Sequence, residues 1–258
     1  MKRISSRDNA VYRRFTRAIA GRIPGCAVLE GIHVCQAWLD HAGAPQQALF
    51  DAERLRQGGE LARLAAALGS DIGVECEPAL MRQLSQVPSG QGVCFMIASP
   101  EPRMPDSIDR NCLWLDRIQD PGNLGTLLRT AAAAGIRQAY LSTGTALAWS
   151  QKVLRSAQGA HFALSIYERV DLSEACGKLA IPLVATTLEG GDSLYAAELP
   201  RHCAWLLGNE GQGVAPALLA RADRRVFVPQ AEGVESLNVA AAAAICLFEQ
   251  RRQRLAHG

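Results

Sequence analysis

The stretch Asp120-Pro121-Gly122-Asn123-Leu124-Gly125-Thr126-Leu127-Leu128-Arg129-Thr130-Ala131 predicts the junction of a strand with a helix in the second half of the chain. An apolar run, residues 112–115, precedes it, and small or apolar residues continue to residue 134. Asn and Gly favour turns and helix N-termini, so we expect a helix over 123–134. The glycine spacing is not G-x-G-x-x-G, which argues against a dinucleotide fingerprint.

Apolar segments alternate with helical ones from this junction to the C-terminus. The predicted strands are residues 112–115, 139–142, 163–167, 182–186, 204–207 and 226–228, and the predicted helices are residues 123–134, 149–158, 172–180, 214–221 and 237–253. Strands separated by helices of this length imply right-handed crossovers and a mostly parallel sheet.

A smaller alternating segment comes first in the chain. It combines a basic amphipathic helix over 7–22 with strands and helices that are expected at 27–31, 32–40, 47–50, 60–68, 72–76 and 93–98. Residues 99–107 hold three prolines and almost no apolar residue, which indicates a linker. We therefore expect an α/β protein with two domains, residues 1–98 and 108–258.

The composition is that of a soluble globular chain, with 48% hydrophobic and 20% charged residues among 258. A net charge of +2 does not indicate a nucleic-acid binder, but its distribution is uneven. Only Asp8 opposes the basic residues of the first 22 positions, which are Lys2, Arg3, Arg7, Arg13, Arg14, Arg17 and Arg22. A basic arm can follow phosphates, although a solvated helix face has the same composition.

Eight cysteines occur without any C-x-x-C pair, and several lie in apolar runs. This indicates reduced, buried thiols in a cytoplasmic protein without a metal site. The charged N-terminus does not resemble a signal peptide, and no apolar stretch is long enough to span a membrane. The five histidines match no catalytic position, so we expect them at the surface or as helix caps.

Two further polar clusters border apolar segments. Gly208-Asn209-Glu210-Gly211 follows the predicted strand 204–207, and its glycines indicate either a tight turn or a loop that a ligand approaches closely. Ser236-Leu237-Asn238 opens the last predicted helix, where Ser236 is a fair N-cap and free backbone N–H groups can orient Asn238. Each cluster alone is weak evidence, and Arg129 alone could be a cation extending from its helix to solvent.

Together, in this order and spacing, the three segments resemble the motifs of the SpoU/TrmH RNA 2′-O-ribose methyltransferases of the SPOUT superfamily. The first motif is Asn123 with Arg129, the second is Gly208-Asn209-Glu210-Gly211, and the third is Pro229 with Ser236-Leu237-Asn238-Val239. The match covers about residues 110–258. In the N-terminal part, Ile4-Ser5-Ser6-Arg7-Asp8-Asn9 and Leu29-Glu30-Gly31-Ile32-His33 are similar to the family's ribosomal-protein-like substrate-binding domain.

The resemblance implies a fold, a cofactor and an assembly. The C-terminal α/β sheet would contain a deep trefoil knot, whose loops would bind S-adenosylmethionine. The protein would be a homodimer formed through this domain. The resemblance also implies the residues of the cofactor site, which are Thr186, Thr187, Leu188, Gly208, Asn209, Gly211, Val228, Pro229 and Leu237.

By the same resemblance Arg129 is the catalytic residue, and Asn123, Glu210, Ser236 and Asn238 form its polar support. An Arg is a poor general base because its pKa exceeds about 12. We prefer Arg129 as the group that stabilises a developing alkoxide, with an RNA phosphate as proton acceptor. Glu210 could instead orient Arg129 through an ion pair, and the sequence does not decide between these roles.

Three functions remain open at this stage. The first is methyl transfer to a ribose 2′-OH, with ribosomal RNA favoured over transfer RNA and with Arg7, Arg13, Arg14 and Arg17 holding the RNA. The second is a non-enzymatic RNA-binding or ribosome-assembly factor that retains the fold. The third is methylation of an RNA base, against which the Ser236-Leu237-Asn238 motif argues.

Overall fold

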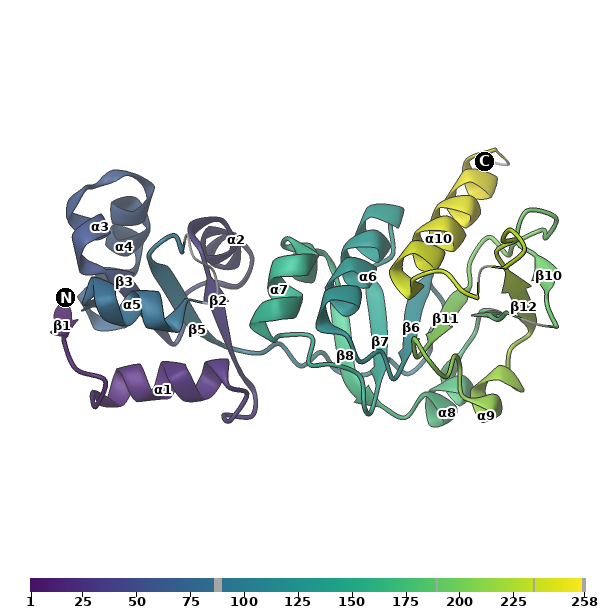
Figure 1. Cartoon of the computed structure of the whole chain (residues 1–258), viewed down its shortest axis with the longest axis horizontal. Helices are drawn as coiled ribbons and strands as arrows, with labels where there is room; N and C mark the ends of the chain where they lie inside the picture. The colour runs from purple at the N-terminus through teal and green to yellow at the C-terminus, as the bar shows by residue number, and fades with distance from the viewer. Residues whose placement is uncertain (86–89, 189, 234, 257–258) are drawn as a thin grey trace. The chain divides into compact units, whose positions relative to one another are not determined.

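A computed structural model describes residues 1–85, 90–188, 190–233 and 235–256 (Figure 1). Its internal contacts divide the chain into two compact units. The first is Met1–Pro100 with Trp149–Leu154, and the second is Glu101–Ala148 with Arg155–Gly258. The segment Trp149–Leu154 therefore belongs to the first unit, although the chain on both sides of it belongs to the second.

The first unit is a five-stranded sheet with the order β1-β4-β3-β5-β2. β5 is antiparallel to β2 and to β3, whereas β1, β3 and β4 pair in parallel. The strands are β1 (Lys2–Ile4), β2 (Cys26–Glu30), β3 (Gln47–Asp51), β4 (Gly73–Cys76) and β5 (Val93–Ala98). The helices are α1 (Ala10–Ile19), α2 (Ile32–Ala42), α3 (Ala52–Arg56), α4 (Gly59–Ile72) and α5 (Pro78–Leu84). The short elements β1, α3 and α5 were not expected from the sequence.

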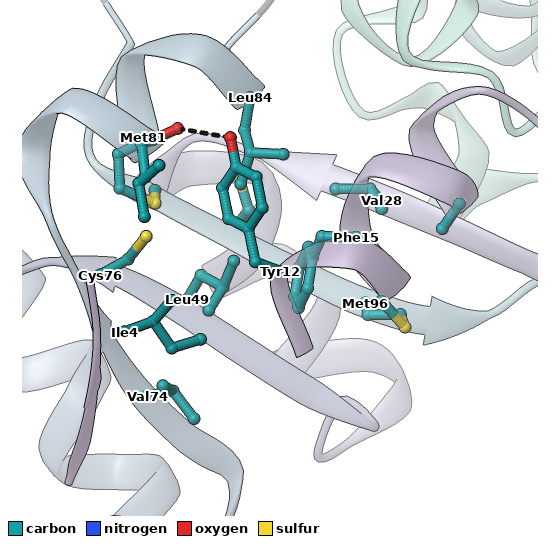
Figure 2. Close-up of a cluster of buried hydrophobic side chains, with 13 residues drawn as sticks. Ile4, Tyr12, Phe15, Val28, Leu49, Val74, Cys76, Met81, Leu84 and Met96 are labelled. Carbon is teal, nitrogen blue, oxygen red and sulfur yellow. Dashed lines mark hydrogen bonds between the residues drawn. The ribbon is translucent and has the colours of Figure 1, made fainter. Parts of the chain in front are cut away.

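Helix α1 covers one face of this sheet with an apolar stripe. Tyr12, Phe15 and Ala18 are buried at helical spacing and pack with strand residues such as Leu49 (Figure 2). The Tyr12 hydroxyl donates a hydrogen bond to the carbonyl oxygen of Leu80 at 3.2 Å, which satisfies a buried polar group. The basic side chains of α1 stay exposed on the opposite face, namely Arg13, Arg14 and Arg17.

The second unit is a seven-stranded sheet with the order β10-β12-β9-β11-β6-β7-β8, and every pair of neighbours is parallel. The strands are β6 (Cys112–Asp116), β7 (Gln138–Ser142), β8 (Ser165–Val170), β9 (Leu183–Thr186), β10 (Asp192–Ser193), β11 (Ala204–Gly208) and β12 (Arg224–Phe227). The helices are α6 (Pro121–Ala134), α8 (Leu172–Ala175), α9 (Pro216–Leu219) and α10 (Val239–Ala256). Helix α7 (Gln151–Ala157) begins in the segment that belongs to the first unit and ends in the second unit. This confirms the parallel α/β sheet that the alternating pattern predicted.

Several element boundaries differ from the sequence expectation. The expected strand 163–167 begins only at Ser165, because Ala160–Ala163 forms a 3-10 turn. The expected helix 172–180 ends at Ala175 and continues as a 3-10 turn over Cys176–Lys178, where Gly177 weakens the helix. The last helix begins at Val239 rather than at residue 237.

The cysteines agree with the sequence expectation of buried thiols. All eight are free thiols, and six of them are buried.

One histidine differs from the sequence expectation. His33, His41 and His202 are exposed, and His257 lies outside the described residues. His161, expected at the surface or in a cap, is instead 3% exposed, and its Nε2 lies 2.7 Å from the carbonyl oxygen of Ala148. Burial of the imidazole lowers the pKa of His161 to about 4.

In the described part of the chain no helix is both long and apolar enough to cross a membrane. Within the same residues no group of three His, Cys, Asp or Glu side chains is arranged to hold a metal ion.

The low pKa of His161 predicts that the protein loses stability in mild acid. The unfolded chain binds a proton at His161 below about pH 6.5 and the folded chain only below about 4. The contribution is therefore complete above pH 6.5 and lost as the pH falls towards 4, by an amount of order 2–3 kcal/mol. Urea denaturation between pH 4 and 7 measures it. The pH slope should be smaller in His161→Gln, and an unchanged slope would contradict this assignment; exposed His202→Gln is the control.

Candidate functional site

Side chains from all three sequence motifs meet in one chain of hydrogen bonds. The Asn238 Nδ2 amide donates to Asn123 Oδ1 at 2.9 Å, and Asn123 Nδ2 donates to Glu210 Oε1 at 3.1 Å. These residues are 115 and 87 positions apart in the sequence. The fold therefore assembles three of the five predicted catalytic residues into one polar cluster.

Two helix N-termini hold the amides of this cluster. Asp120 caps α6 by accepting the backbone N–H of Asn123 at 2.8 Å, with Pro121 in the first turn. Asn238 caps α10, and its Oδ1 accepts the N–H groups of Ala240 and Ala241 at 2.9 and 3.3 Å. Because α6 and α10 pack against one another, their N-terminal ends bring both amides together (Figure 1).

The N-cap of α10 corrects one sequence expectation. Ser236 was expected to cap a helix that starts at residue 237. The helix instead starts at Val239, and Asn238 is its cap. Ser236 is exposed and makes no hydrogen bond with any residue that the structure describes. Its hydroxyl is therefore available to a ligand, and its predicted place in the catalytic set stays a prediction.

Glu210 is held as a carboxylate. Partial burial raises the pKa of its carboxyl, but the hydrogen bonds from Asn123 and from the backbone N–H groups of Gln119 and Asp120 outweigh this effect, so the pKa lies below its ordinary value. A carboxylate with a lowered pKa is charged at neutral pH and is a weak base. Glu210 is thus better suited to orienting Asn123 than to removing a proton.

Arg129 is exposed on α6, and it forms no hydrogen bond or ion pair with the described residues. Glu210 therefore does not pair with Arg129, contrary to one alternative from the sequence, because Glu210 bonds Asn123 instead. On the helix surface the exposed Thr126 lies between Asn123 and Arg129. The unpaired guanidinium is suited to binding an external anionic group beside the polar cluster.

The loop after β11 is built by Asn209. Its Oδ1 accepts the backbone N–H groups of Gly211 and Gln212 at 2.9 and 3.0 Å, and its Nδ2 donates to the carbonyl oxygen of Arg117 at 2.9 Å. Asn209 and Gly213 also exchange both backbone hydrogen bonds. The Asn209 side chain is thus used in shaping the loop that carries Glu210, which supports a structural role rather than a direct chemical one.

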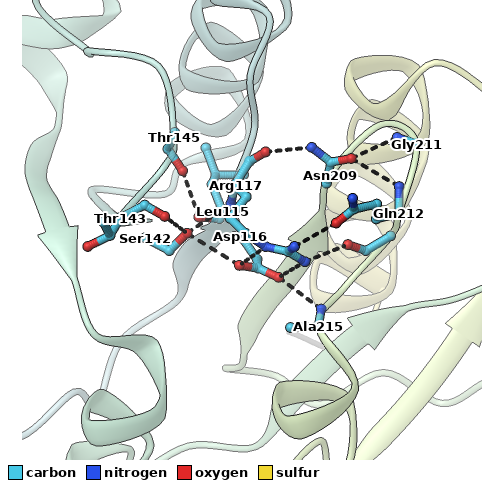
Figure 3. A network of polar contacts seen from close by, with 11 residues as sticks. Leu115, Asp116, Arg117, Ser142, Thr143, Thr145, Asn209, Gly211, Gln212 and Ala215 are labelled. Carbon is cyan, nitrogen blue, oxygen red and sulfur yellow. Dashed lines mark hydrogen bonds and ion pairs between the residues drawn. The ribbon is translucent and has the colours of Figure 1, made fainter.

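Asp116 and Arg117 anchor this loop, and the sequence analysis did not select them (Figure 3). The Asp116 carboxylate is 3% exposed and accepts from both the Arg117 guanidinium, twice at 3.1 Å, and the backbone N–H of Ala215, at 2.9 Å. Arg117 has a φ of 56° and donates to Gln212 Oε1 at 2.8 Å. The available signal was their position directly after the predicted strand 112–115, at the carboxyl end of a parallel sheet.

The predicted cofactor residues follow three adjacent strands, β12, β9 and β11. Thr186 ends β9, and the N–H of Thr187 donates to the carbonyl oxygen of Val226 at 2.9 Å. The remaining residues lie in the loops beyond the strand ends. Leu188 is 64% and Leu237 36% exposed, Val228 is half-buried, and Pro229 and Gly211 are exposed. Exposed leucines beside open backbone suit a partly apolar ligand.

Gly208 is required by the loop itself. A Cβ on Gly208 would collide with the backbone of Gly213 and Val214, which folds back over the end of β11. Of the two alternatives from the sequence, a tight turn or a close approach by a ligand, the position of Gly208 agrees with the tight turn, because the protein's own chain makes the close approach.

Residues 110–248 match the model of the SpoU rRNA Methylase family. The chain belongs to this family. The 23S rRNA (guanosine(2553)-2′-O)-methyltransferase RlmP of Bacillus subtilis is 33% identical to this chain over 232 residues, which cover 87% of this chain and 88% of the relative. The 23S rRNA (guanosine-2′-O-)-methyltransferase RlmB of Salmonella typhimurium is 32% identical over 241 residues, which cover 88% and 98%.

A solved rRNA methyltransferase structure has the same fold over nearly the whole chain. The crystal structure of an AdoMet-bound rRNA methyltransferase from Sinorhizobium meliloti superposes with a TM-score of 0.84 at 25% identity and covers 97% of each chain. These comparisons confirm the SpoU family that the three motifs indicated and the parallel α/β sheet flanked by helices.

The crowding at Gly208 predicts that replacing Gly208 with Ala destabilises the protein more than replacing Gly211, a second glycine of the same loop. Gly208→Ala should lower the free energy of unfolding by about 1–3 kcal/mol, because backbone atoms would have to move. Gly211→Ala is the matched control, since its Cβ would meet only Asn209 Oδ1 at 3.6 Å. Thermal denaturation compares the two. Equal stability of both variants would contradict the close approach of Gly213 to Gly208.

Proposed function

We propose that this protein transfers a methyl group from S-adenosylmethionine to a ribose 2′-OH of ribosomal RNA. The observation that carries the proposal is the hydrogen-bonded chain Asn238–Asn123–Glu210, which joins the three SpoU motifs. Arg129 extends from the helix that carries Asn123 and has no partner among the described residues. The two SpoU relatives named as 23S rRNA methyltransferases support ribosomal over transfer RNA. The complete motif set does not favour a non-enzymatic RNA binder, because binding alone does not require it.

The loops after β9, β11 and β12 fit the chemistry of the cofactor. Thr186, Thr187 and Leu188 would border its adenosine, while Gly208, Val228 and Leu237 would hold it mainly through backbone groups. The half-apolar, half-polar lining of these loops is what a nucleoside joined to an amino acid requires. When bound, S-adenosylmethionine supplies an activated methyl group on a sulfonium. Asn209, Gly211 and Pro229 would contribute by fixing the loops.

The chain's own residues would orient and activate the acceptor. Arg129 would bind the ribose and its phosphate and stabilise the charge that develops on the 2′-oxygen. Glu210 would hold Asn123 and, through it, Asn238 in one orientation. Because hydrogen bonds lower the pKa of Glu210, it is a poor acceptor for the 2′-OH proton, and an RNA phosphate is the better one. Ser236 would add a hydrogen bond near the acceptor.

The test of the proposed function is methyl transfer from labelled S-adenosylmethionine to undermethylated ribosomal and transfer RNA, followed by nucleoside analysis. The proposal expects label in a 2′-O-methyl nucleoside of the ribosomal fraction. Label in a methylated base would refute the ribose assignment. A protein without transfer and without cofactor-induced stabilisation, which should reach about 2.7 kcal/mol at 100 times Kd, would be an RNA binder instead.

Arg129→Ala should lower kcat/KM for methyl transfer by about 10²–10³-fold, because it removes the cation that faces the developing charge. Its melting temperature and its affinity for the cofactor should stay close to those of the wild type, since Arg129 bonds to no described residue. Arg110→Ala is the matched control, because Arg110 is also exposed but lies before the amino end of β6, whereas α6 with Arg129 follows the carboxyl end. A folded Arg129→Ala protein with wild-type activity would reject this role.

We assign RNA binding to residues 1–98, a linker to residues 99–107 and methyl transfer to residues 108–258. The ribosomal-protein-like character of the first unit is part of this proposal. The exposed basic face of α1, with Arg13, Arg14 and Arg17, and the nearby Arg7 would follow RNA phosphates. Charge reversal at two of these arginines should weaken RNA binding and flatten its salt dependence, and an unchanged slope would disprove their role.

We also propose a homodimer through the second unit. Phe248 and Leu255 are 46% and 72% exposed and lie seven residues apart, on one face of α10. A partner subunit would cover these two apolar side chains, which flank the exposed Arg252 on this face. In sedimentation experiments the wild type should be a dimer and Phe248→Glu a monomer, whereas Leu147→Glu, at another exposed leucine of the second unit, should remain a dimer. A dimeric Phe248→Glu protein would exclude this interface.

The trefoil knot and the cytoplasmic location complete the proposal. The knot is supported by the position of β11 between β9 and β6 and by the return of the chain from β12 to α6, where Asn238 bonds Asn123. A crystal structure with an unthreaded C-terminal segment would exclude it. A ribosomal RNA substrate implies the compartment in which ribosomes assemble, so recovery of the protein outside the cytoplasmic fraction would contradict the location.

A further inference from the structure

A hollow of ≈ 560 Å³ opens in the first unit, and its lining contains no residue of the SpoU motifs. Ile32 follows β2, Asp51 ends β3, and Arg82 belongs to α5, which follows β4. These three strands run in the same direction, because β2 and β3 are both antiparallel to β5 and β4 is parallel to β3. The hollow thus lies at the carboxyl ends of strands, where α/β folds bind ligands.

Asp51 presents a hydrogen-bond acceptor to this hollow. Its side chain belongs to a residue that is only 6% exposed, and Oδ1 caps α3 by accepting the N–H groups of Glu53 and Arg54 at 3.0 Å each. Among the described residues none donates a hydrogen bond to Oδ2. Oδ2 itself is not fully buried, so it is open to the hollow and can accept a hydrogen bond from a ligand there.

The other polar groups of the hollow have both signs and are not paired with each other. Glu53 supplies a second carboxylate, and Arg54 and Arg82 supply guanidinium donors. In the described part of the chain none of the three forms an ion pair. Ile32 adds an apolar surface. The hollow can therefore accept hydrogen bonds from one edge of a ligand, donate to another edge and contact a flat face.

The hollow is not suited to a phosphate. At the N-terminus of α2, one of the backbone N–H groups that could bind an anion is already occupied, because Gln91 Oε1 accepts the N–H of Ile32 at 2.6 Å. Gly31 makes room for this contact, since a Cβ there would lie 2.9 Å from Gln91 Oε1. Two carboxylates in the lining also repel anions.

We infer that this hollow binds a guanine base of the RNA substrate, which deepens the proposed function and rests on it. Guanine donates from N1–H and the 2-amino group, which match the carboxylates of Asp51 and Glu53, and accepts at O6 and N7, which match Arg54 and Arg82. Unstacked loop nucleotides are the parts of RNA that proteins read by base edge and flat face. The first unit thus selects RNA by a base as well as by charge.

The test changes the acceptor and keeps the helix cap. Asp51→Asn retains an N-cap residue but turns the free oxygen into an amide donor, which opposes N1–H of guanine. Asp171→Asn is the matched control, because Asp171 caps α8 through the same two-bond pattern, at 2.9 and 3.1 Å, in the second unit. The guanidinium donors are tested in the same way with Arg82→Gln, for which Arg56→Gln is the control. Both arginines are exposed, but only Arg82 lines the hollow.

The probe is undermethylated ribosomal RNA treated with kethoxal, which modifies the N1 and 2-amino edge of guanine. The wild-type protein should protect one guanine that Asp51→Asn and Arg82→Gln leave reactive, and each of these variants should raise the RNA Kd about tenfold. The kcat at saturating RNA should not change. Inosine at the protected position, which lacks the 2-amino group, should weaken binding to the wild type about tenfold and to Asp51→Asn much less.

The outcomes separate this inference from the proposed function. If Asp51→Asn and Arg82→Gln bind, protect and methylate RNA as the wild type does, the guanine site is wrong and the methyltransferase assignment stands. If the wild type methylates no RNA fraction, the proposed function fails and this inference fails with it. A free nucleotide has the same edge, so guanosine monophosphate is a second probe. Guanosine monophosphate could stabilise the wild-type protein but not Asp51→Asn, while both proteins protect the same guanines of the RNA from kethoxal. That result would overturn RNA as the source of the bound guanine.

Discussion

The second unit depends on the parallel pairing of β11 with β6, which sets Gly208 opposite Asp116 at the carboxyl edge of the sheet. This register brings the loop after β11 within reach of the Asp116 carboxylate, which binds the Arg117 guanidinium and the N–H of Ala215. A buried carboxylate with all of these donors is stable, and losing one of them would leave a costly unsatisfied charge. Glu210 is part of that loop, so its position relative to Asn123 follows from the same register.

Helix capping is combined with function at two places. Asp120 caps α6 and so orients Asn123, while Asn238 itself caps α10 and donates its amide to Asn123. Asn is well suited to this double use, because its oxygen can accept backbone N–H groups while its amide donates elsewhere. The candidate site is thereby fixed by backbone geometry, whereas Arg129 extends from the same helix, has no partner among the described residues and can adapt to a ligand.

The sequence predicted much of this architecture because the decisive signals are local. Alternating apolar segments gave the parallel sheet, and the three motifs gave the SpoU family and the residues Asn123, Glu210 and Asn238. The sequence predictions were wrong where a contact between distant segments determines the position of a side chain or the start of a helix. His161 was misplaced because its burial depends on packing with Ala148, and the N-cap of α10 moved from Ser236 to Asn238 because hydrogen bonds to α10 and α6 both favour the latter.

By itself the sequence determined the fold class, the family and the set of polar residues, since strand periodicity, helix caps and motif spacing are properties of short segments. Only the tertiary structure decided which of those residues touch: that Glu210 bonds Asn123 and not Arg129, that Asp116 and Arg117 hold the loop, and that Asp51 borders a hollow. These contacts join residues tens of positions apart, and strand order and register bring them together, which no local pattern specifies.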